Sequence, residues 1–383
     1  MKVKLSDICD YVKGKTSVSE LDERTYISTE NMLPNKMGIS LASSLPSTEQ
    51  TQVYYKNDVL ISNIRPYFKK IWKAEWDGGC SADVLVFRAK TGVHQDFLYF
   101  VLSDDKFFEY SMATSKGTKM PRGDKTSIMQ YEVELPTYAE QVKIASILSD
   151  FEEKIKLNNK INNNLAEQSQ AILKKYMDDF EYTLTPLGEI ANIIDCLHSK
   201  KPDMVDNTTK QLLQLNNITD TGFLDLSSKY YISETDYENW TRKCEIVEGD
   251  CVITNVGRIG AVSQAPVGTH AAMGRNMTCI RLKKDKPYYS FLITALLSNH
   301  IRREIMKNTD EGTIMGALNV KNIPLLQFPI FSSEQMKSLE ESLYPIRKSI
   351  EHNYLANQKL SDLRDTLLPK LMSGTIDLSS VPI

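Results

Sequence analysis

Residues 149–177 read SDFEEKIKLNNKINNNLAEQSQAILKKYM, and this stretch decides the fold. Apolar side chains recur along it at alternating intervals of four and three residues, which is typical of a helix that packs lengthwise against another helix. These apolar positions form one stripe along the helix, which we call the seam, and Asn158 and Asn162 occupy two positions of it. Ser149 and Glu152 have the spacing of a capping box, so we expect this helix to begin there and to extend about 40 Å.

The same seam returns after an interval of 195 residues. Asn353 and Asn357 stand where Asn158 and Asn162 stood, and Pro345 suits the first turn of a second helix. Polar residues at matched steps of two apolar seams indicate an internal repeat in which each copy ends in a long helix. We expect the two helices to pair antiparallel, with the asparagines fixing the register. The alternative is a pair of unrelated amphipathic helices.

The segments before the helices repeat as well. In the first half a KND turn (56–58) precedes the apolar run 59–62, and in the second half EGD (248–250) precedes the run 251–255. Short apolar runs mixed with helical patterns predict an α+β fold with two pseudo-repeated domains, each a mixed, mostly antiparallel sheet with helices. A short helix over 139–148 should lead into the first long helix, and the two long helices should form a coiled-coil-like spacer. The predicted parts are residues 1–137, 138–180, 181–331 and 332–383.

Composition limits the classes of function. The chain has 383 residues, of which 41% are hydrophobic and 25% charged, as in ordinary soluble proteins. It has no run of 18 apolar residues and its first ten residues lack a signal region, so we expect no membrane span and a cytoplasmic location. The six cysteines form no CxxC pair and the five histidines do not cluster near them, which favours reduced buried thiols over a zinc site. A net charge of −3 argues against a protein that holds DNA alone through many phosphates, so positive charge must be local or come from partners.

Catalytic motifs are missing from the sequence. It contains no Walker A loop, GxGxxG turn, HExxH segment or GxSxG segment. Single histidines such as His94, His198 and His270 are more often structural than catalytic. The sequence therefore predicts a non-catalytic binding module with two non-equivalent halves.

Three segments carry a family resemblance. Residues 135–148 (LPTYAEQVKIASIL) lead into the first long helix, and residues 328–335 (FPIFSSEQ) and 367–374 (LLPKLMSG) flank the second. With these segments, and with the order variable region, helix, variable region, helix, the whole chain resembles the specificity subunit of type I restriction-modification systems.

The resemblance implies a mechanism. Each variable region would be a target recognition domain that reads one half of a split site in double-stranded DNA, and the helices would set the spacing. Two modification subunits, which carry the S-adenosylmethionine chemistry, would bind the helical parts, and motor-nuclease subunits would complete the cleaving complex. The chain itself would hold no cofactor and no metal. A helix of the expected length suits half-sites about one DNA turn, ~34 to 36 Å, apart.

Two segments of the first half are candidates for DNA contact, because base reading needs Arg, Asn or Gln and phosphates are held by Lys, Arg, Ser and Thr. Segment 63–70 (NIRPYFKK) interleaves basic and aromatic residues on a turn after a strand; its alternative is a solvated hairpin with Tyr67 and Phe68 in the core. Loop 115–125 (SKGTKMPRGDK) is basic and contains glycine; its alternative is a flexible exposed loop. The predicted contact residues are Asn63, Arg65, Tyr67, Lys69, Lys70, Lys116, Lys119, Arg122 and Lys125.

The second half offers corresponding candidates. Segments 255–258 (NVGR) and 312–313 (GT) match those of the first half, 198–201 (HSKK) is a further basic turn, and in 274–276 (GRN) glycine would allow close approach. The predicted contact residues are His198, Lys200, Lys201, Asn255, Arg258, Arg275, Asn276 and Thr313. The tryptophans, Trp72, Trp76 and Trp240, are expected in the core or in domain packing.

Two other functions stay open from the sequence. The chain could be a fragment of a fused restriction or methylation enzyme with an unrecognised active site, and methyl transfer by the purified chain with DNA and S-adenosylmethionine alone would indicate this. It could also be a scaffold whose halves bind protein, against which the matched loops rich in Lys, Arg and Asn argue.

Overall fold

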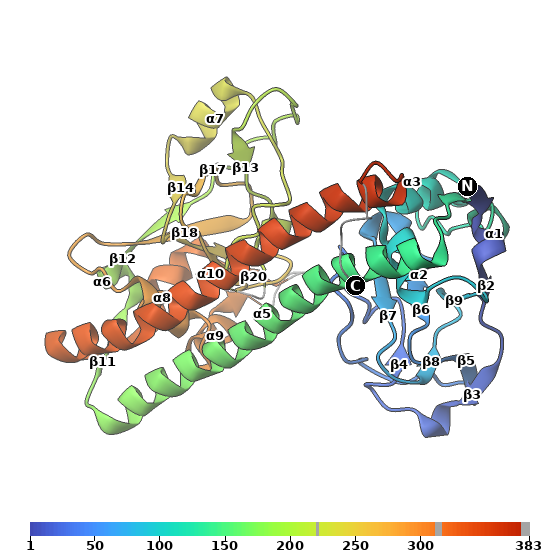
Figure 1. Ribbon diagram of the computed structural model, residues 1–383. Coiled ribbons are helices and arrows are strands. Elements are labelled where there is room, and N and C mark those ends of the chain that lie inside the picture. The colour runs from blue at the N-terminus through green and yellow to red at the C-terminus, as the bar shows by residue number, and fades with distance from the viewer. Residues whose placement is uncertain (220–221, 311–315, 377–383) are drawn as a thin grey trace. The chain divides into compact units, whose positions relative to one another are not determined.

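Figure 1 shows the computed structural model, which describes residues 1–219, 222–310 and 316–376. The chain forms two compact units, Met1–Ile155 with Lys359–Ile383 and Lys156–Gln358. It passes from the first unit into the second within helix α5 (Tyr138–Asp179) and returns within helix α10 (Ser333–Met372). The predicted α+β class is confirmed, whereas the division into four parts stays a prediction. None of the helices described is both long and apolar enough to cross a bilayer.

The first unit contains sheets of order β2-β9-β6-β7 and β3-β5-β8-β4 and a ribbon β1-β10. Neighbouring strands are antiparallel except β4 and β8, which are parallel. The strands are β1 (Lys2–Lys4), β2 (Cys9–Tyr11), β3 (Lys15–Ser17), β4 (Tyr26–Ile27), β5 (Gln50–Tyr54), β6 (Val59–Ser62), β7 (Ile71–Lys73), β8 (Gly78–Cys80), β9 (Val84–Ala89) and β10 (Glu132–Glu134). The shorter helices are α1 (Leu5–Ile8), α2 (Gln95–Ser103), α3 (Asp105–Ala113) and α4 (Lys125–Ile128), with 3-10 turns η1 (Val18–Glu20) and η2 (Pro66–Phe68).

The central strands of the first sheet are buried on both faces, which explains their unbroken apolar runs. Side chains alternate between the two faces of a strand. Val59 and Ile61 of β6 therefore pack with Phe87 and with helices α2 and α3, whereas Leu60 packs with Trp72 in a separate core on the opposite face.

The second unit repeats this plan with sheets of order β12-β18-β15-β16 and β13-β17-β14 and a ribbon β11-β21. Its short strand β13 lies parallel to β17, as β4 lies to β8. The strands are β11 (Thr183–Pro186), β12 (Ala191–Asp195), β13 (Gln211–Leu212), β14 (Glu245–Val247), β15 (Cys251–Thr254), β16 (Val262–Gln264), β17 (His270–Ala272), β18 (Met277–Leu282), β19 (Thr309–Asp310), β20 (Ala317–Leu318) and β21 (Gln327–Ile330). The shorter helices are α6 (Leu187–Ile190), α7 (Glu234–Thr241), α8 (Tyr289–Leu296) and α9 (Asn299–Lys307), with 3-10 turns η3 (Leu215–Asn217) and η4 (Val320–Leu325).

An ion pair between an arginine and a buried aspartate recurs in both units and confirms the repeat. The Asp58 carboxylate accepts hydrogen bonds from the Arg88 guanidinium at 2.7 and 2.8 Å, and Asp250 accepts from Arg281 at 2.8 and 2.6 Å. Both aspartate side chains are only 3% exposed. The residue before each aspartate has a left-handed backbone, with φ of 73° and 85°, so the two turns have the same shape. The matched KND and EGD turns thus hold a structural carboxylate.

The asparagines of the long helices pair across the seam in the second unit. Asn158 Nδ2 donates to Asn357 Oδ1 at 2.8 Å, and Asn353 Nδ2 donates to Asn162 Oδ1 at 2.9 Å. The first asparagine of one helix thus meets the second asparagine of the other, as in two copies related by a twofold axis. Antiparallel pairing in an asparagine-defined register is therefore confirmed, and the alternative of unrelated helices is wrong.

Both long helices begin earlier than the sequence indicated. Thr137 N–H and Oγ1–H donate to the Glu140 carboxylate at 2.8 and 2.7 Å, which caps α5. Ser332 and Gln335 form a similar reciprocal cap before α10, at 3.1 and 3.3 Å. The capping box expected at Ser149 is wrong, because residues 139–148 continue into the long helix without a break.

Two further consequences follow from these earlier starts. Pro345 lies inside α10 and not in its first turn. Helix α5 has 42 residues and is therefore about 63 Å long at 1.5 Å per residue, so the expected length of 40 Å was too short.

Candidate nucleic-acid interface

Segment 63–70 leaves strand β6 through a strained turn. Arg65 and Lys69 flank the 3-10 turn η2, and both have left-handed backbones, with φ of 51° and 50°. Non-glycine residues rarely adopt this conformation, and such strain gathers at functional sites. Tyr67 is 48% and Phe68 37% exposed, so the alternative that placed both rings in the core is wrong.

Loop 115–125 lies against segment 63–70. The Arg65 N–H donates to the Pro121 carbonyl at 2.8 Å, and Ile64 forms a β-bridge with Arg122. A second bridge between Lys116 and Arg122 closes the loop on itself. The structure therefore brings both predicted segments of the first half into one surface.

The loop contributes the most exposed positive charge of this surface. Lys116 is 80% exposed and pairs with Asp124 at 2.7 Å, and Arg122 is 54% exposed and pairs with Asp83 at 3.2 Å. Exposed ion pairs of this kind contribute little to stability, so a phosphate can replace the carboxylate. The exposed predicted cations of the loop are Lys116, Lys119, Arg122 and Lys125.

The two lysines of segment 63–70 contact protein groups. Lys69 Nζ lies 2.7 Å from the Asp105 carboxylate. Lys70 Nζ donates to the Thr29 carbonyl at 2.6 Å, and burial lowers the pKa of this lysine. These contacts hold the segment in place, and DNA contact by either lysine stays a prediction.

Asn63 and Asn255 occupy equivalent positions after β6 and β15 and are both buried, 8% and 7% exposed. The Asn63 carbonyl accepts from the Gly123 N–H at 3.2 Å, and Asn255 Nδ2 donates to the Leu318 carbonyl at 3.1 Å. Each asparagine thus joins two chain segments, and base contact by either one stays a prediction. Within the described residues, Asn63 Oδ1 and Arg65 Nε are buried without a hydrogen-bond partner.

In the second unit, predicted residues from two separate turns line one pocket of about 320 Å³. Lys201 comes from one turn, and Arg275 and Asn276 come from the other. Gly274 lies so close to the Leu213 carbonyl that an added Cβ would stand 2.1 Å from it, so chain packing requires this glycine, and close approach to DNA stays a prediction. The lining residues are Lys201, Leu212, Gln214, Leu215, Asn216, Trp240, Arg275 and Asn276.

Sequence reasoning missed two carboxamides of this pocket. Gln214 Nε2 donates to the Leu213 carbonyl at 3.1 Å and Asn216 Nδ2 donates to Ser228 Oγ at 2.7 Å, which orients both groups. The amide-rich run 211–217 (QLLQLNN) was the signal that could have found them. Trp240 is 5% exposed, which confirms its predicted core position, and it also lines the pocket.

The other predicted residues of the second unit are not among those that line this pocket. His198 is 66% exposed, with Nε2 2.7 Å from Asp195 Oδ2, and Lys200 is exposed. Arg258 is exposed and donates to the Ile218 carbonyl at 3.0 Å. Thr313 lies outside the described residues.

Two groups of three possible metal-ligand side chains lie within the described residues. Asp195, Cys196 and His198 offer three ligands, as do Cys244, Asp250 and Cys279, whereas structural zinc takes four. In the second cluster the Asp250 carboxylate is held by Arg281. All six cysteines are buried and outside disulfide bonds, as predicted, and burial raises the pKa of Cys9, Cys80 and Cys251 to about 12.

Comparison with known proteins supports the resemblance seen in the sequence. Residues 1–167 match the family model described as type I restriction modification DNA specificity domain. The MjaVIII specificity subunit of a type I restriction enzyme from Methanocaldococcus jannaschii is 23% identical, with 99% of this chain and 93% of the relative covered. The HindI specificity subunit from Haemophilus influenzae is 21% identical, with 97% and 98% covered.

The chain thus carries a type I restriction modification DNA specificity domain in residues 1–167, and along nearly its whole length it is similar to type I restriction enzyme specificity subunits. The crystal structure of a type I specificity subunit from M. genitalium has the same fold, with a TM-score of 0.50 and 16% identity over 97% of this chain and 96% of that one. The resemblance carried by residues 135–148 and 328–335 is thereby confirmed.

Proposed function

We propose that this specificity subunit is the DNA-recognition component of a type I restriction-modification complex, and that each half reads one part of a bipartite site. The main observation in support of the proposal is that segments predicted separately to contact DNA lie next to one another within each unit. Segment 63–70 lies against loop 115–125 in the first unit, and Lys201, Arg275 and Asn276, from two separate turns, line one pocket in the second.

The chemistry of the two surfaces differs, which supports an asymmetric site. The first surface combines an arginine on a strained turn with an exposed tyrosine and exposed cations, which suits guanine reading with phosphate contacts. The second combines Arg275 with the carboxamides of Gln214, Asn216 and Asn276. Carboxamides pair with adenine and arginine pairs with guanine in the major groove, so we expect both kinds of base pair in the second half-site.

The partners follow from the family. We propose that two modification subunits bind the helical parts and carry the S-adenosylmethionine chemistry, that motor-nuclease subunits join in the cleaving complex, and that this chain is non-catalytic and cytoplasmic. The net charge of −3 supports DNA binding by several subunits together, because the partner subunits would then supply part of the positively charged surface that contacts the phosphates.

The experiment compares two arginine variants within the second unit. The subunit is assembled with its modification subunit, and binding to duplexes that carry the methylated motif is measured over a series of salt concentrations. Arg275→Ala should weaken specific binding by about 1–3 kcal/mol and relax one half-site while assembly is unchanged. Arg303→Ala is the control, because Arg303 is exposed on α9 and bonds to the Asn299 carbonyl of its own helix. Equal affinities for both variants would place DNA reading elsewhere.

A further inference from the structure

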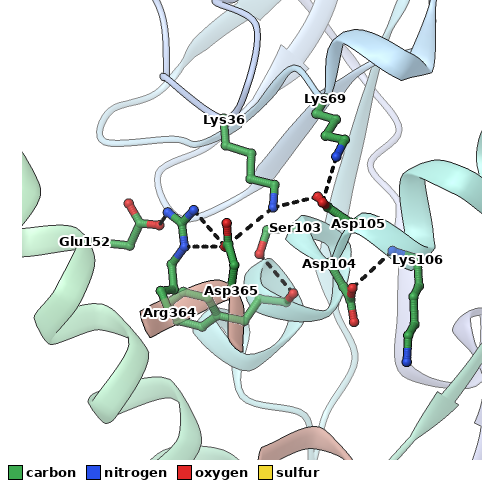
Figure 2. Close-up of polar contacts among 10 residues, drawn as sticks. Lys36, Lys69, Ser103, Asp104, Asp105, Lys106, Glu152, Arg364 and Asp365 are labelled. Carbon is green, nitrogen blue, oxygen red and sulfur yellow. Dashed lines mark hydrogen bonds and ion pairs between the residues drawn. The ribbon is translucent and has the colours of Figure 1, made fainter. Parts of the chain in front are cut away.

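Oppositely charged side chains form a chain of ion pairs that begins at Lys69, in the strained turn at residues 65–69 of the first unit (Figure 2). Lys69 Nζ is 2.7 Å from Asp105 Oδ2, and Lys36 Nζ is 2.9 Å from the other oxygen of the same carboxylate. Lys36 Nζ also lies 3.8 Å from Asp365 Oδ1 on helix α10. Asp365 pairs with Arg364 at 2.8 Å, and Arg364 pairs with Glu152 of helix α5 at 2.5 Å. Three cations and three anions thus lead from the turn to both long helices.

The backbone of the same region is under strain on two sides. Asn35 and Lys36 have left-handed backbones, with φ of 56° and 62°, as Arg65 and Lys69 have. The Asn35 N–H donates to the Phe68 carbonyl at 2.8 Å, and the Lys36 N–H donates to the Lys69 carbonyl at 2.9 Å. Strain of this kind persists only where surrounding contacts fix the conformation.

The charges at the centre have little access to water. The Lys36 side chain is 8% and the Arg364 side chain 11% exposed. A buried ammonium must be paired, because an unpaired charge in such a site is strongly unfavourable. If the turn moved, Lys69 would leave Asp105 and the backbone contacts to Lys36 would break, so the turn is tied to the charge chain.

We propose that Lys36, Asp105 and Asp365 are positioning residues that fix the turn at residues 65–69 to the helix pair, so that Arg65 and Tyr67 are held ready for DNA. This inference rests on the proposed function of segment 63–70. In this proposal Lys69 holds the turn against the protein through Asp105. Loss of that contact should then change the reading of one half-site only.

The test uses charge removal with a matched control. Lys36→Met removes the central ammonium, and Lys106→Met removes an exposed lysine one residue after Asp105. Each variant is assembled with the modification subunit and titrated with three duplexes: the site found by methylation sequencing, that site with one half scrambled, and that site with the other half scrambled. Thermal melting of each variant is recorded alongside.

We expect Lys36→Met to bind the intact site about tenfold more weakly, the scale of one charge-assisted hydrogen bond, and Lys106→Met to bind as wild type. On the duplex whose first-unit half-site is scrambled, Lys36→Met and wild type should bind equally. Lys36→Arg should restore most of the affinity. Should Lys36→Met fail to fold, Asp365→Asn carries the same expectation, since Arg364 keeps its contact with Glu152.

Two results would overturn the inference. One is a Lys36→Met or Asp365→Asn variant that reads both half-sites as wild type does. The other is an equal loss on both half-sites that Lys36→Arg does not restore. Failure of the proposed function is distinguishable, because then the wild-type complex itself would show no preference for the intact site over the scrambled duplexes.

Discussion

The asparagine pairs of the helix seam allow a direct energetic test of the repeat. Asn158 is 2% exposed, and its amide donates to Asn357 at 2.8 Å. Asn158→Ala removes this bond and leaves the Asn357 oxygen without its donor. A net hydrogen bond is worth about 0.5–1.5 kcal/mol, and the full penalty of about 1–3 kcal/mol for an orphaned acceptor applies only when that acceptor is buried; because Asn357 is half-buried, we expect a destabilisation of about 1–2 kcal/mol.

A double-mutant cycle isolates the pair from the other effects of truncation. We expect Asn158→Ala and Asn357→Ala to be coupled by about 0.5–1.5 kcal/mol, and Asn162→Ala and Asn353→Ala to be coupled similarly. Asn158 and Asn353 are the matched control. They are equivalent in the repeat, but no hydrogen bond joins them in the described part of the chain, so their effects should add.

The assay is urea unfolding of the full chain followed by helical circular dichroism, with each single variant, each double variant and wild type measured together. The slope of the unfolding free energy against urea concentration must stay constant within each cycle, so that shifts of the unfolding midpoint report changes in stability. Coupling below about 0.3 kcal/mol for the bonded pairs, or equal coupling for the control pair, would refute the crossed register.

Three further predictions concern buried charge and thiols. Asp250→Ala should destabilise the second unit by about 1.5–3 kcal/mol, because it removes the charge-assisted hydrogen bonds from Arg281, whose side chain is 35% exposed, whereas Asp285→Ala, on a carboxylate 73% exposed, should change the unfolding free energy by less than about 0.5 kcal/mol. Burial by itself would raise the pKa of Asp105, but the ion pairs with Lys69 and Lys36 outweigh it and lower this pKa, so the carboxylate stabilises the fold above the unfolded value of about 3.9 and loses that effect as pH falls below it. The stability difference between wild type and Asp105→Asn, measured by urea unfolding, should therefore shrink between pH 6 and pH 3, as estimated from that unfolded value. The buried cysteines should react with a thiol reagent only after unfolding, and rapid labelling of the native chain would contradict their placement.

The features that the sequence predicted well depend on local pattern. The alternating spacing of four and three residues predicted the helix that carries the seam asparagines, and unbroken apolar runs predicted strands β6 and β9. The structure contains this helix and both strands at the expected residues. The start of α5 could not be placed, because Ser149 and Thr137 both precede an acidic residue by three positions, and only packing of residues 139–148 decides between them.

The features that the sequence did not predict depend on contacts between distant residues. The ion pair of Lys69 with Asp105 could not be foreseen, because Asp105 lies in helix α3, separate in sequence from the basic run, and DNA contact by Lys69 stays a prediction. The pocket joins Lys201 with Gln214 and Arg275 through tertiary packing that no local pattern encodes. The two copies of the repeat have also diverged, so a contact in one copy does not predict the same contact in the other. Arg347 occupies the repeat position of Glu152, but in place of the ion pair that Glu152 forms with Arg364 it donates to the Gly222 carbonyl at 2.7 Å.

The most direct measurement is single-molecule methylation sequencing of DNA from cells that express the neighbouring modification subunit with wild-type chain, Arg65→Ala or Arg275→Ala. The proposed function predicts a split, asymmetric methylated motif that requires this chain, with Arg65→Ala relaxing bases in one half and Arg275→Ala relaxing bases in the other. A motif that is independent of this chain, or that both variants alter in the same half, would contradict the assignment of one half-site to each unit.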